Sequence, residues 1–362
     1  MSRNIAILAG DGIGPEVMTQ TVRILKAIGY RFDSNFTFHY GEIGGSAFEK
    51  FGSHFPQETK ILCTQADAIL VGSVGGPISE SHLPKWAHCE RNSILQLRKE
   101  FCFNVNLRPI SLNSQLQILS PLKQSKESKP IDMVIVRELV GDIYFGKHER
   151  SISKGLRVAL DEASYSENQI CSVAHFAFEL ARSRKGKVSS VDKANVLETS
   201  RLWREVVNEV SVEYADVQLE HVLVDHCAMK MIQAPDQFDV VLASNLFGDI
   251  LSDLGAAILG SLGLLPSASI NKETGFGLYE PAGGSAPDIA GKNIANPIAQ
   301  ILSAAMMLRL SFNMTREAQV IENAVQKAIF NGYRTKDLCI GFQNSVSTEQ
   351  FTNEIIRIIE KE

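Results

Sequence analysis

Two aspartates four residues apart, Asp249 and Asp253, stand in the segment NLFGDILSD. On a helix this spacing places both carboxylates on one face, where their like charges repel each other. A divalent cation such as Mg²⁺ or Mn²⁺ would relieve that repulsion, because it prefers carboxylate oxygens as ligands. Asp225, which ends the apolar run Val222–Val224, could supply a third ligand. The alternative is a pair of acids stabilised near the N-terminus of a helix by its dipole.

Three arginines form the next set of candidates: Arg98 in LQLRK, Arg108 in NLRP and Arg137 at the end of an apolar run. A guanidinium group presents a rigid fork that binds a carboxylate through two hydrogen bonds. Three such groups near a metal ion would form a pocket for an acid with several carboxylates. Taken singly, each arginine could equally be a surface ion-pair partner.

Tyr144 and Lys193 are candidates for proton transfer. A lysine close to a cation has a lowered pKa, which lets it serve as a base near neutral pH. In isolation, a lysine is most often a solvated surface residue.

The segment from Glu280 to Gly291 predicts a fixed loop rich in glycine and proline, whose backbone can approach a phosphate or a ribose closely. Asp288 could accept hydrogen bonds from ribose hydroxyls and would repel a 2′-phosphate, which favours NAD over NADP. An ordinary rigid loop is the alternative. The glycine turn at 10–15 also follows a strand, but its spacing is GxGxG, so it is weak evidence for a dinucleotide site.

The composition is that of an ordinary soluble globular protein of one or two domains, with 362 residues and a net charge of −5. This charge argues against nucleic acid or an anionic membrane as the main partner. Six scattered cysteines without a CxxC pair indicate a reducing compartment. No segment reads as a secretion signal or a membrane span. We therefore expect a cytoplasmic protein.

Apolar strands alternate with helical patterns, which predicts an α/β architecture with ligands at the carboxyl ends of the strands. The predicted strands cover 5–9, 66–71, 131–136 and 238–243, and the predicted helices 196–210 and 295–311. The polar stretch 120–130 is expected to be a surface loop, and 146–168 a loop or a protruding arm.

Together these segments resemble the β-decarboxylating dehydrogenases that act on isopropylmalate, isocitrate, homoisocitrate and tartrate. The resemblance covers nearly the whole chain. Within the family, IYFG around Tyr144 and DIAG at 288–291 look like the NAD-using isopropylmalate branch. The motifs that carry it are GDGIGPEV at 10–17, GSVGGP at 72–77, LRK and LRP around Arg98 and Arg108, RELVGDIYFG at 137–146, SVDKANVLETSRLWREVV at 190–207, NLFGDILSD at 245–253 and GSAPDIAGKNIANP at 284–297.

The resemblance implies a two-domain fold with a large mixed sheet, not a Rossmann fold. Residues 1–103 and 261–362 would form the NAD-binding domain. Residues 104–260 would be an inserted domain carrying the dimer interface and the metal-binding acids, and the active site would draw on both domains. The implied reaction is oxidative decarboxylation of 3-isopropylmalate with NAD⁺ and Mg²⁺ or Mn²⁺, in leucine biosynthesis, by a homodimer.

The resemblance also implies a role for each site residue. Lys193 would take the C2 hydroxyl proton, acting across the dimer interface, and Tyr144 would protonate the enol left after CO₂ departs. The substrate carboxylates would be bound by Arg98, Arg108 and Arg137, with Asp225 also touching substrate. The metal would be bound by Asp225, Asp249 and Asp253. The cofactor would be bound by Gly76, Pro77, Glu90, Glu280, Gly284, Ser285, Ala286, Pro287, Asp288, Ile289 and Asn296.

The segment between Gly76 and Arg98 departs most from the family pattern. Glu90 stands one residue farther from the arginine than in many members, while Ile94 and Leu95 still offer an apolar wall for an isopropyl group. Another decarboxylating dehydrogenase, acting on homoisocitrate, tartrate, malate or isocitrate, is therefore the first alternative. More remote alternatives are a metal-dependent hydrolase and a binding protein that has lost its chemistry.

Overall fold

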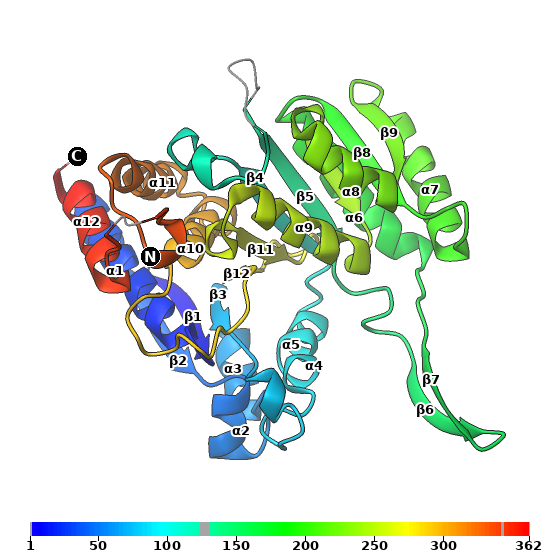
Figure 1. The fold of residues 1–362 in the computed structure, drawn as a ribbon, viewed down its shortest axis with the longest axis horizontal. Coiled ribbons are helices and arrows are strands. Elements are labelled where there is room, and N and C mark those ends of the chain that lie inside the picture. Colours follow the sequence, from blue (N-terminus) through cyan, green and yellow to red (C-terminus); the bar gives the residue numbers. More distant parts are fainter. Residues whose placement is uncertain (1, 124–129, 342–343, 362) are drawn as a thin grey trace. The chain divides into compact units, whose positions relative to one another are not determined.

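The computed structural model describes residues 2–123, 130–341 and 344–361 (Figure 1). Part of the loop predicted at 120–130 lies outside these residues. The chain divides into two compact units. Unit 1 comprises Met1–Phe101, Asn113–Pro121 and Leu259–Glu362, and unit 2 comprises Cys102–Leu112 and Leu122–Ile258. The chain thus leaves unit 1 and returns to it, so unit 1 is built from both ends of the sequence.

The sheet of unit 1 follows the order β2-β1-β3-β12-β11 in the described residues. Neighbouring strands are parallel except β11 and β12, which are antiparallel. The central strands are buried on both faces, as their continuous apolar runs predict. The strand bounds are β1 (Arg3–Gly10), β2 (Phe36–Gly41), β3 (Ala68–Ser73), β11 (Pro266–Ile270) and β12 (Gly277–Pro281).

The helices of unit 1 cover this sheet. α1 (Gly14–Phe32) packs against α12 (Thr348–Lys361) and α10 (Ile298–Leu310) (Figure 1). Helices from the two ends of the chain therefore lie against each other. α10 is buried almost throughout, which explains why its sequence is apolar on all sides. The other helices are α2 (Gly45–Phe51), α3 (Gln57–Thr64), α4 (Cys89–Asn92), α5 (Ile94–Glu100) and α11 (Thr315–Phe330).

The sheet of unit 2 follows the order β4-β5-β10-β8-β9 in the described residues. β4 and β5 are antiparallel and the other neighbours are parallel. The carboxyl ends of β5, β8 and β10 therefore meet at one edge of the sheet, where the chain places its polar residues. The strand bounds are β4 (Val105–Ser111), β5 (Asp132–Glu138), β8 (Lys187–Asp192), β9 (Gln218–Leu223) and β10 (Val240–Ala243).

The helices of unit 2 are α6 (Glu167–Arg182), α7 (Glu198–Ser211), α8 (Val224–Gln233) and α9 (Asn245–Leu259). α9 follows directly after β10, so the strand fixes where the helix begins. The predicted helices at 196–210 and 295–311 correspond to α7 and α10. Short 3₁₀ segments occupy Ile78–Glu80, Ser114–Leu119, Val212–Tyr214, Pro235–Gln237, Leu262–Leu264 and Lys336–Leu338.

A two-stranded antiparallel hairpin, β6 (His148–Ser153) and β7 (Leu156–Asp161), projects from unit 2 (Figure 1). Nearly all of its residues are exposed, including Ile152 and Leu156 at 76% and 70%. The segment 146–168 is thus an arm rather than an irregular loop, followed by the start of α6.

The mixed parallel and antiparallel pairing in both units confirms the expected α/β fold class with a mixed sheet. Among the described residues, no helix is long and apolar enough to cross a membrane.

Candidate active site

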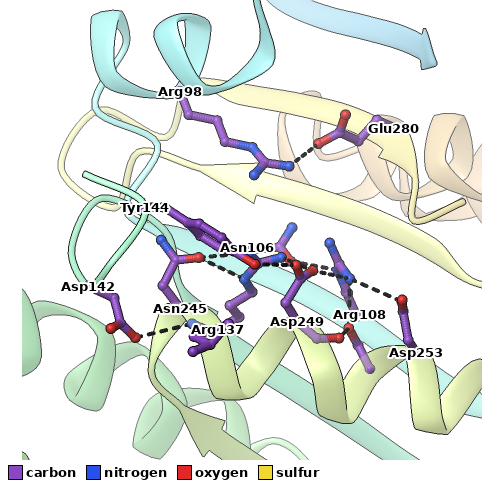
Figure 2. Close-up of polar contacts among 12 residues, drawn as sticks. Arg98, Asn106, Arg108, Arg137, Asp142, Tyr144, Asn245, Asp249, Asp253 and Glu280 are labelled. Atoms are coloured by element: carbon purple, nitrogen blue, oxygen red, sulfur yellow. Dashed lines mark hydrogen bonds and ion pairs between the residues drawn. The ribbon is translucent and has the colours of Figure 1, made fainter. Parts of the chain in front are cut away.

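The first group of site residues gathers around the carboxylate of Asp249, one turn into α9 (Figure 2). Arg137 Nη1 donates to Asp249 Oδ1 at 2.5 Å, and Arg108 Nη1 donates to the same oxygen at 3.3 Å. The hydroxyl of Tyr144 donates to Asp249 Oδ2 at 2.9 Å. Residues expected from three separate motifs therefore meet in unit 2.

Both arginines in this group are nearly inaccessible, with exposures of 2% for Arg137 and 5% for Arg108. Arg137 is held by Asn245 Oδ1, which accepts from Nε at 3.0 Å and from Nη2 at 2.7 Å. An arginine remains charged when buried, so it needs acidic or polar partners around it. Sequence reasoning missed Asn245, although it opens the same NLFGDILSD segment.

Arg108 is fixed in a similar way. Its Nε donates to Asn106 Oδ1 at 3.0 Å and its Nη1 to Ser252 Oγ at 2.6 Å. Asp253 Oδ1 lies 3.9 Å from Arg108 Nη1, and its side chain is 60% exposed. Asp253 thus shares the helix face of Asp249, as its spacing predicts, and has an oxygen open to a further ligand.

Burial and the neighbouring charges shift the acid strength of this group. Burial, followed by the charge of Asp249, raises the pKa of Tyr144 to about 12. Burial also raises the pKa of Asp253, with Asp249 acting in the same direction and Arg108 opposing it. Tyr144 therefore stays protonated at neutral pH and can donate a proton.

Lys193 and Asp225 form a second group in unit 2. Lys193 follows β8, Asp225 lies in the first turn of α8, and the Lys193 ammonium donates to Asp225 Oδ1 at 2.6 Å. This hydrogen bond lowers the pKa of Asp225, whose side chain is 66% exposed. Over the described part of a single copy, no three histidine, cysteine or acidic side chains are placed to hold one metal ion. The structure thus brings Asp249 near Asp253 and leaves Asp225 with Lys193.

Arg98 of α5 lies in unit 1, where its Nη2 donates to Glu280 Oε1 of β12 at 2.8 Å (Figure 2). The two side chains are only 9% and 12% exposed. Within the ranges that the structure describes, the buried Nε of Arg98 has no hydrogen-bond partner. That nitrogen is free to donate to a bound carboxylate.

A cavity of about 570 Å³ opens in unit 1. Its volume falls in the range of small-molecule and cofactor sites, and apolar side chains dominate its wall. The predicted cofactor residues on its wall are Gly284, Ala286, Ile289 and Asn296. The other predicted cofactor residues, which are not on its wall, are Gly76, Pro77, Glu90, Glu280, Ser285, Pro287 and Asp288.

The wall of this cavity also contains residues that sequence reasoning missed. Two of them are Ser261, which donates to Asp337 Oδ2 at 2.5 Å, and Asp337 itself, which also accepts from the predicted Asn296 at 2.9 Å. Gln300 is 1% exposed, and neither atom of its amide group has a hydrogen-bond partner in the described residues. A buried, unpaired amide in an apolar wall fits a site completed by a ligand or by water. No local sequence signal marks these residues, because they come from distant segments.

The glycine turn at 10–14 holds the predicted cofactor loop in place. The N–H of Ile13 donates to the carbonyl of Ser285 at 2.8 Å. Gly12 has a positive φ of 58°, and a Cβ there would lie 1.9 Å from the Ser285 carbonyl oxygen. Only glycine fits this close approach. The turn is therefore a structural support, as its spacing indicates, and Ile13 contributes to the cavity wall.

Glu90, whose register the sequence left uncertain, lies against the 72–77 segment. Its Oε1 would be 2.4 Å from a Cβ placed on Gly75, and the Trp86 ring would be 2.2 Å from one placed on Gly76. Residues 86 and 90 thus both pack against the loop that holds Gly76 and Pro77, two of the predicted cofactor residues.

Comparison with known proteins agrees with this arrangement. The family described as isocitrate/isopropylmalate dehydrogenase matches residues 4–355. The chain is 53% identical over 338 residues to a 3-isopropylmalate dehydrogenase of Haemophilus influenzae, covering 93% of this chain and 94% of that protein. It is 50% identical to the protein of the same name from Colwellia psychrerythraea, covering 99% of both chains.

Among solved structures, the isocitrate dehydrogenase of Methylococcus capsulatus is similar, with a TM-score of 0.87, 31% identity and 99% coverage of both chains. The match therefore covers the fold and the motifs together. On this evidence, the chain belongs to the isocitrate/isopropylmalate dehydrogenase family.

Proposed function

We propose that this protein oxidatively decarboxylates 3-isopropylmalate to 4-methyl-2-oxopentanoate, in the leucine pathway of the cytoplasm. The observation that carries the proposal is a sequence identity of 53% and 50%, over nearly the full length, to two relatives named 3-isopropylmalate dehydrogenase. The group of Arg108, Arg137 and Tyr144 around Asp249 supports it with chemistry suited to a dicarboxylic acid. The cofactors proposed are NAD⁺ and Mg²⁺ or Mn²⁺.

The arginines bind the substrate carboxylates. Arg108 and Arg137 are buried and held by neighbouring side chains, so their guanidinium groups lose little freedom when an anion binds. Arg98, with its unpaired Nε, joins them as the third carboxylate ligand. Together they give the site a positive field despite the net charge of −5.

Carboxylate oxygens of Asp249, Asp253 and Asp225 suit a hard divalent cation, and these residues hold it in the proposed enzyme. When bound, the cofactor would supply a hydride acceptor, and the cation would supply positive charge to stabilise the C2 oxygen. Lys193 removes the proton of the C2 hydroxyl. Tyr144, which the structure keeps protonated, donates a proton to the enol carbon once CO₂ has left.

The cofactor is held chiefly by the 284–296 loop and the cavity beside it. Asp288 accepts from the ribose hydroxyls, and Asn296 contacts the adenosine half. Gly76, Pro77 and Glu90 would flank the nicotinamide, and Glu280 would be a further cofactor residue. In this proposal, residues 1–103 with 261–362 form the NAD-binding domain, and 104–260 form the domain of the metal acids and the dimer interface.

A homodimer completes the site. In the described part of one copy, Asp225 pairs with Lys193 and does not join Asp249 and Asp253 in a metal-ligating group, which supports a second copy as the source of one of the two groups. The β6–β7 hairpin supports association. A two-stranded hairpin with exposed apolar side chains is only marginally stable in water by itself, and a second copy would cover those side chains. Two-fold symmetry then forms two equal sites, each with Lys193 from the other copy.

Mixing two inactive variants tests this exchange. Tyr144→Phe and Lys193→Ala copies, unfolded and refolded together, should form mixed dimers in which one of the two sites has all its catalytic residues. Equal mixing should restore about a quarter of wild-type activity, since about half of the dimers are mixed and each carries one complete site. No recovery, with mixed dimers shown by mass, would place both groups in the same copy.

A substrate panel tests the reaction itself. With NAD⁺ and Mn²⁺, NADH should form rapidly with 3-isopropylmalate and slowly with isocitrate, homoisocitrate, tartrate and malate. A chelator should abolish the activity and added Mn²⁺ should restore it. A faster rate with any other acid would identify that acid, and not 3-isopropylmalate, as the substrate. Activity on a phosphate or amide ester without NAD⁺ would instead indicate a metal-dependent hydrolase.

A further inference from the structure

The hydroxyl of Tyr165 lies where the two segments that carry the reacting groups meet in unit 2. One segment is the turn after β5, which leads to Tyr144. The other is the first turn of α9, which leads to Asp249. Tyr165 itself comes from a third segment, just before α6.

The α9 side of this junction is a backbone contact. The N–H of Asn245, the first residue of the helix, donates to the Tyr165 hydroxyl at 2.9 Å. The N–H groups of a helix's first turn lack partners within the helix, so each needs an external acceptor. Tyr165 therefore helps to set where α9 begins and, with it, the position of Asp249.

The β5 side of the junction is the carboxylate of Glu138, which is fully buried. It accepts from the N–H groups of Val140 and Gly141, at 2.8 and 2.9 Å, and the Tyr165 hydroxyl donates to Asp142 Oδ2 of the same turn at 3.5 Å. The Tyr165 ring also packs so closely on Gly141 that a Cβ there would lie 2.4 Å from it. Tyr165 thus contacts the turn through both its ring and its hydroxyl.

Asp142 and Asn245 fasten the turn directly to α9. Asp142 Oδ2 accepts from the N–H of Leu246 at 3.1 Å, and the Asn245 amide donates to the Gly141 carbonyl at 3.1 Å (Figure 2). Asn245 also holds Arg137 through its other amide atom. The network therefore links the substrate arginine, the Tyr144 turn and the metal-binding helix.

We infer that Tyr165 is a positioning residue, which fixes the turn after β5 against α9 so that the Tyr144 hydroxyl meets the Asp249 carboxylate. This inference rests on the function proposed above. The Tyr165 side chain contacts Asp142, Gly141 and Asn245, so Tyr165 acts through these residues. Its effect on the reaction must therefore pass through the placement of Tyr144.

The variant Tyr165→Phe isolates the hydroxyl. It keeps the ring that packs on Gly141 and edge-on against Trp203, at 5.5 Å between centroids. It removes the acceptor for the Asn245 N–H and the donor to Asp142 Oδ2. We expect kcat to fall about tenfold, the order of one lost buried hydrogen bond, with KM for NAD⁺ unchanged. The solvent isotope effect on kcat should rise, because proton donation by a displaced Tyr144 becomes slower than the other steps.

A double-mutant cycle gives the decisive readout. If Tyr165 acts by placing Tyr144, adding Tyr165→Phe to Tyr144→Phe should lower kcat by less than twofold further, because the group being placed has lost its proton. A merely structural role would lower kcat by the same factor in both backgrounds. Glu138→Gln keeps the shape of its side chain and should lower kcat less in the Tyr144→Phe background than in wild type. It replaces Tyr165→Phe in the cycle if Tyr165→Phe does not fold.

Tyr214→Phe is the matched control. The Tyr214 hydroxyl is hydrogen-bonded to the His175 ring at 2.8 Å, and its ring stacks on Phe178; neither partner is a proposed site residue. This variant should lose comparable stability in urea and keep wild-type kcat. A kcat within twofold of wild type for Tyr165→Phe, or equal losses in both backgrounds, would overturn the inference. Failure of wild-type protein to oxidise 3-isopropylmalate would instead refute the proposed function.

Discussion

Tyr144 and Asp249 are 105 positions apart in the sequence, yet the tyrosine hydroxyl donates to the aspartate carboxylate at 2.9 Å. Arg137 donates to the other oxygen of the same carboxylate, at 2.5 Å. The proposed proton donor therefore contacts the same carboxylate as Arg137, which is proposed to bind substrate. Anything that moves α9 relative to the turn after β5 changes both contacts together.

Tyr144→Phe should lower kcat by roughly 10²- to 10⁴-fold, the usual contribution of a positioned acid, and should change KM little. The phenylalanine ring keeps the packing and loses only the proton and its hydrogen bond to Asp249. Steady-state kinetics with 3-isopropylmalate measure both constants. Retention of near-full kcat would remove Tyr144 from the mechanism.

Leu95→Ala should weaken recognition of the isopropyl group. Ile94 is 7% exposed and belongs to the core, whereas Leu95 is only partly buried, so Leu95 has a face free to contact substrate. We expect kcat/KM to fall about tenfold or more with 3-isopropylmalate, because apolar contacts of this size contribute roughly 1–3 kcal/mol. Malate, which lacks the group, is the control substrate and should react at the same low rate in both proteins. Equal losses on both substrates would place the recognition wall elsewhere.

NAD⁺ should protect the protein against heating. A ligand present at one hundred times its Kd raises the free energy of unfolding by about 2.7 kcal/mol, which shifts Tm by several degrees. NADP⁺ at the same concentration should protect less, because Asp288 is expected to repel its 2′-phosphate. Calorimetry with each nucleotide measures the difference. Equal melting temperatures with and without NAD⁺ would favour the hydrolase alternative.

Glu138 should make the protein less stable as pH rises toward neutrality. Burial raises the pKa of Glu138 from 4.5 to about 7, although the N–H groups of Val140 and Gly141 oppose the shift. Between these pH values the folded state binds a proton that the unfolded state has lost, so the stabilisation present below pH 4.5 disappears as pH rises through about 7.

The free energy of unfolding should fall by on the order of 3 kcal/mol over this pH range, and this fall should be absent in Glu138→Gln. Urea unfolding of both proteins at acidic and neutral pH measures the slope of the free energy of unfolding against pH. Glu58→Gln, a change at an exposed position, should leave the slope as it is in the wild type. A wild-type slope in Glu138→Gln would show that other groups titrate in this range.

Much of the fold could be read from local sequence patterns. Apolar runs predicted strands that are buried on both faces, and the pattern at 196–210 predicted α7, because strand and helix periodicity are properties of neighbouring residues. The hairpin arm was less certain, since its exposed residues show no alternation.

The sequence by itself determined the residue types of the site and the local spacings, such as Asp249 and Asp253 on one helix face. Tertiary structure decided which groups meet, because β4, β5 and α9 come together only in the folded unit. It also showed the role of Asn245, which opens the NLFGDILSD motif, and it supplied Tyr165 and Asp337, which no local pattern marks. Long-range contacts of this kind depend on strand order and packing, and neither is contained in the spacing of residues along one segment.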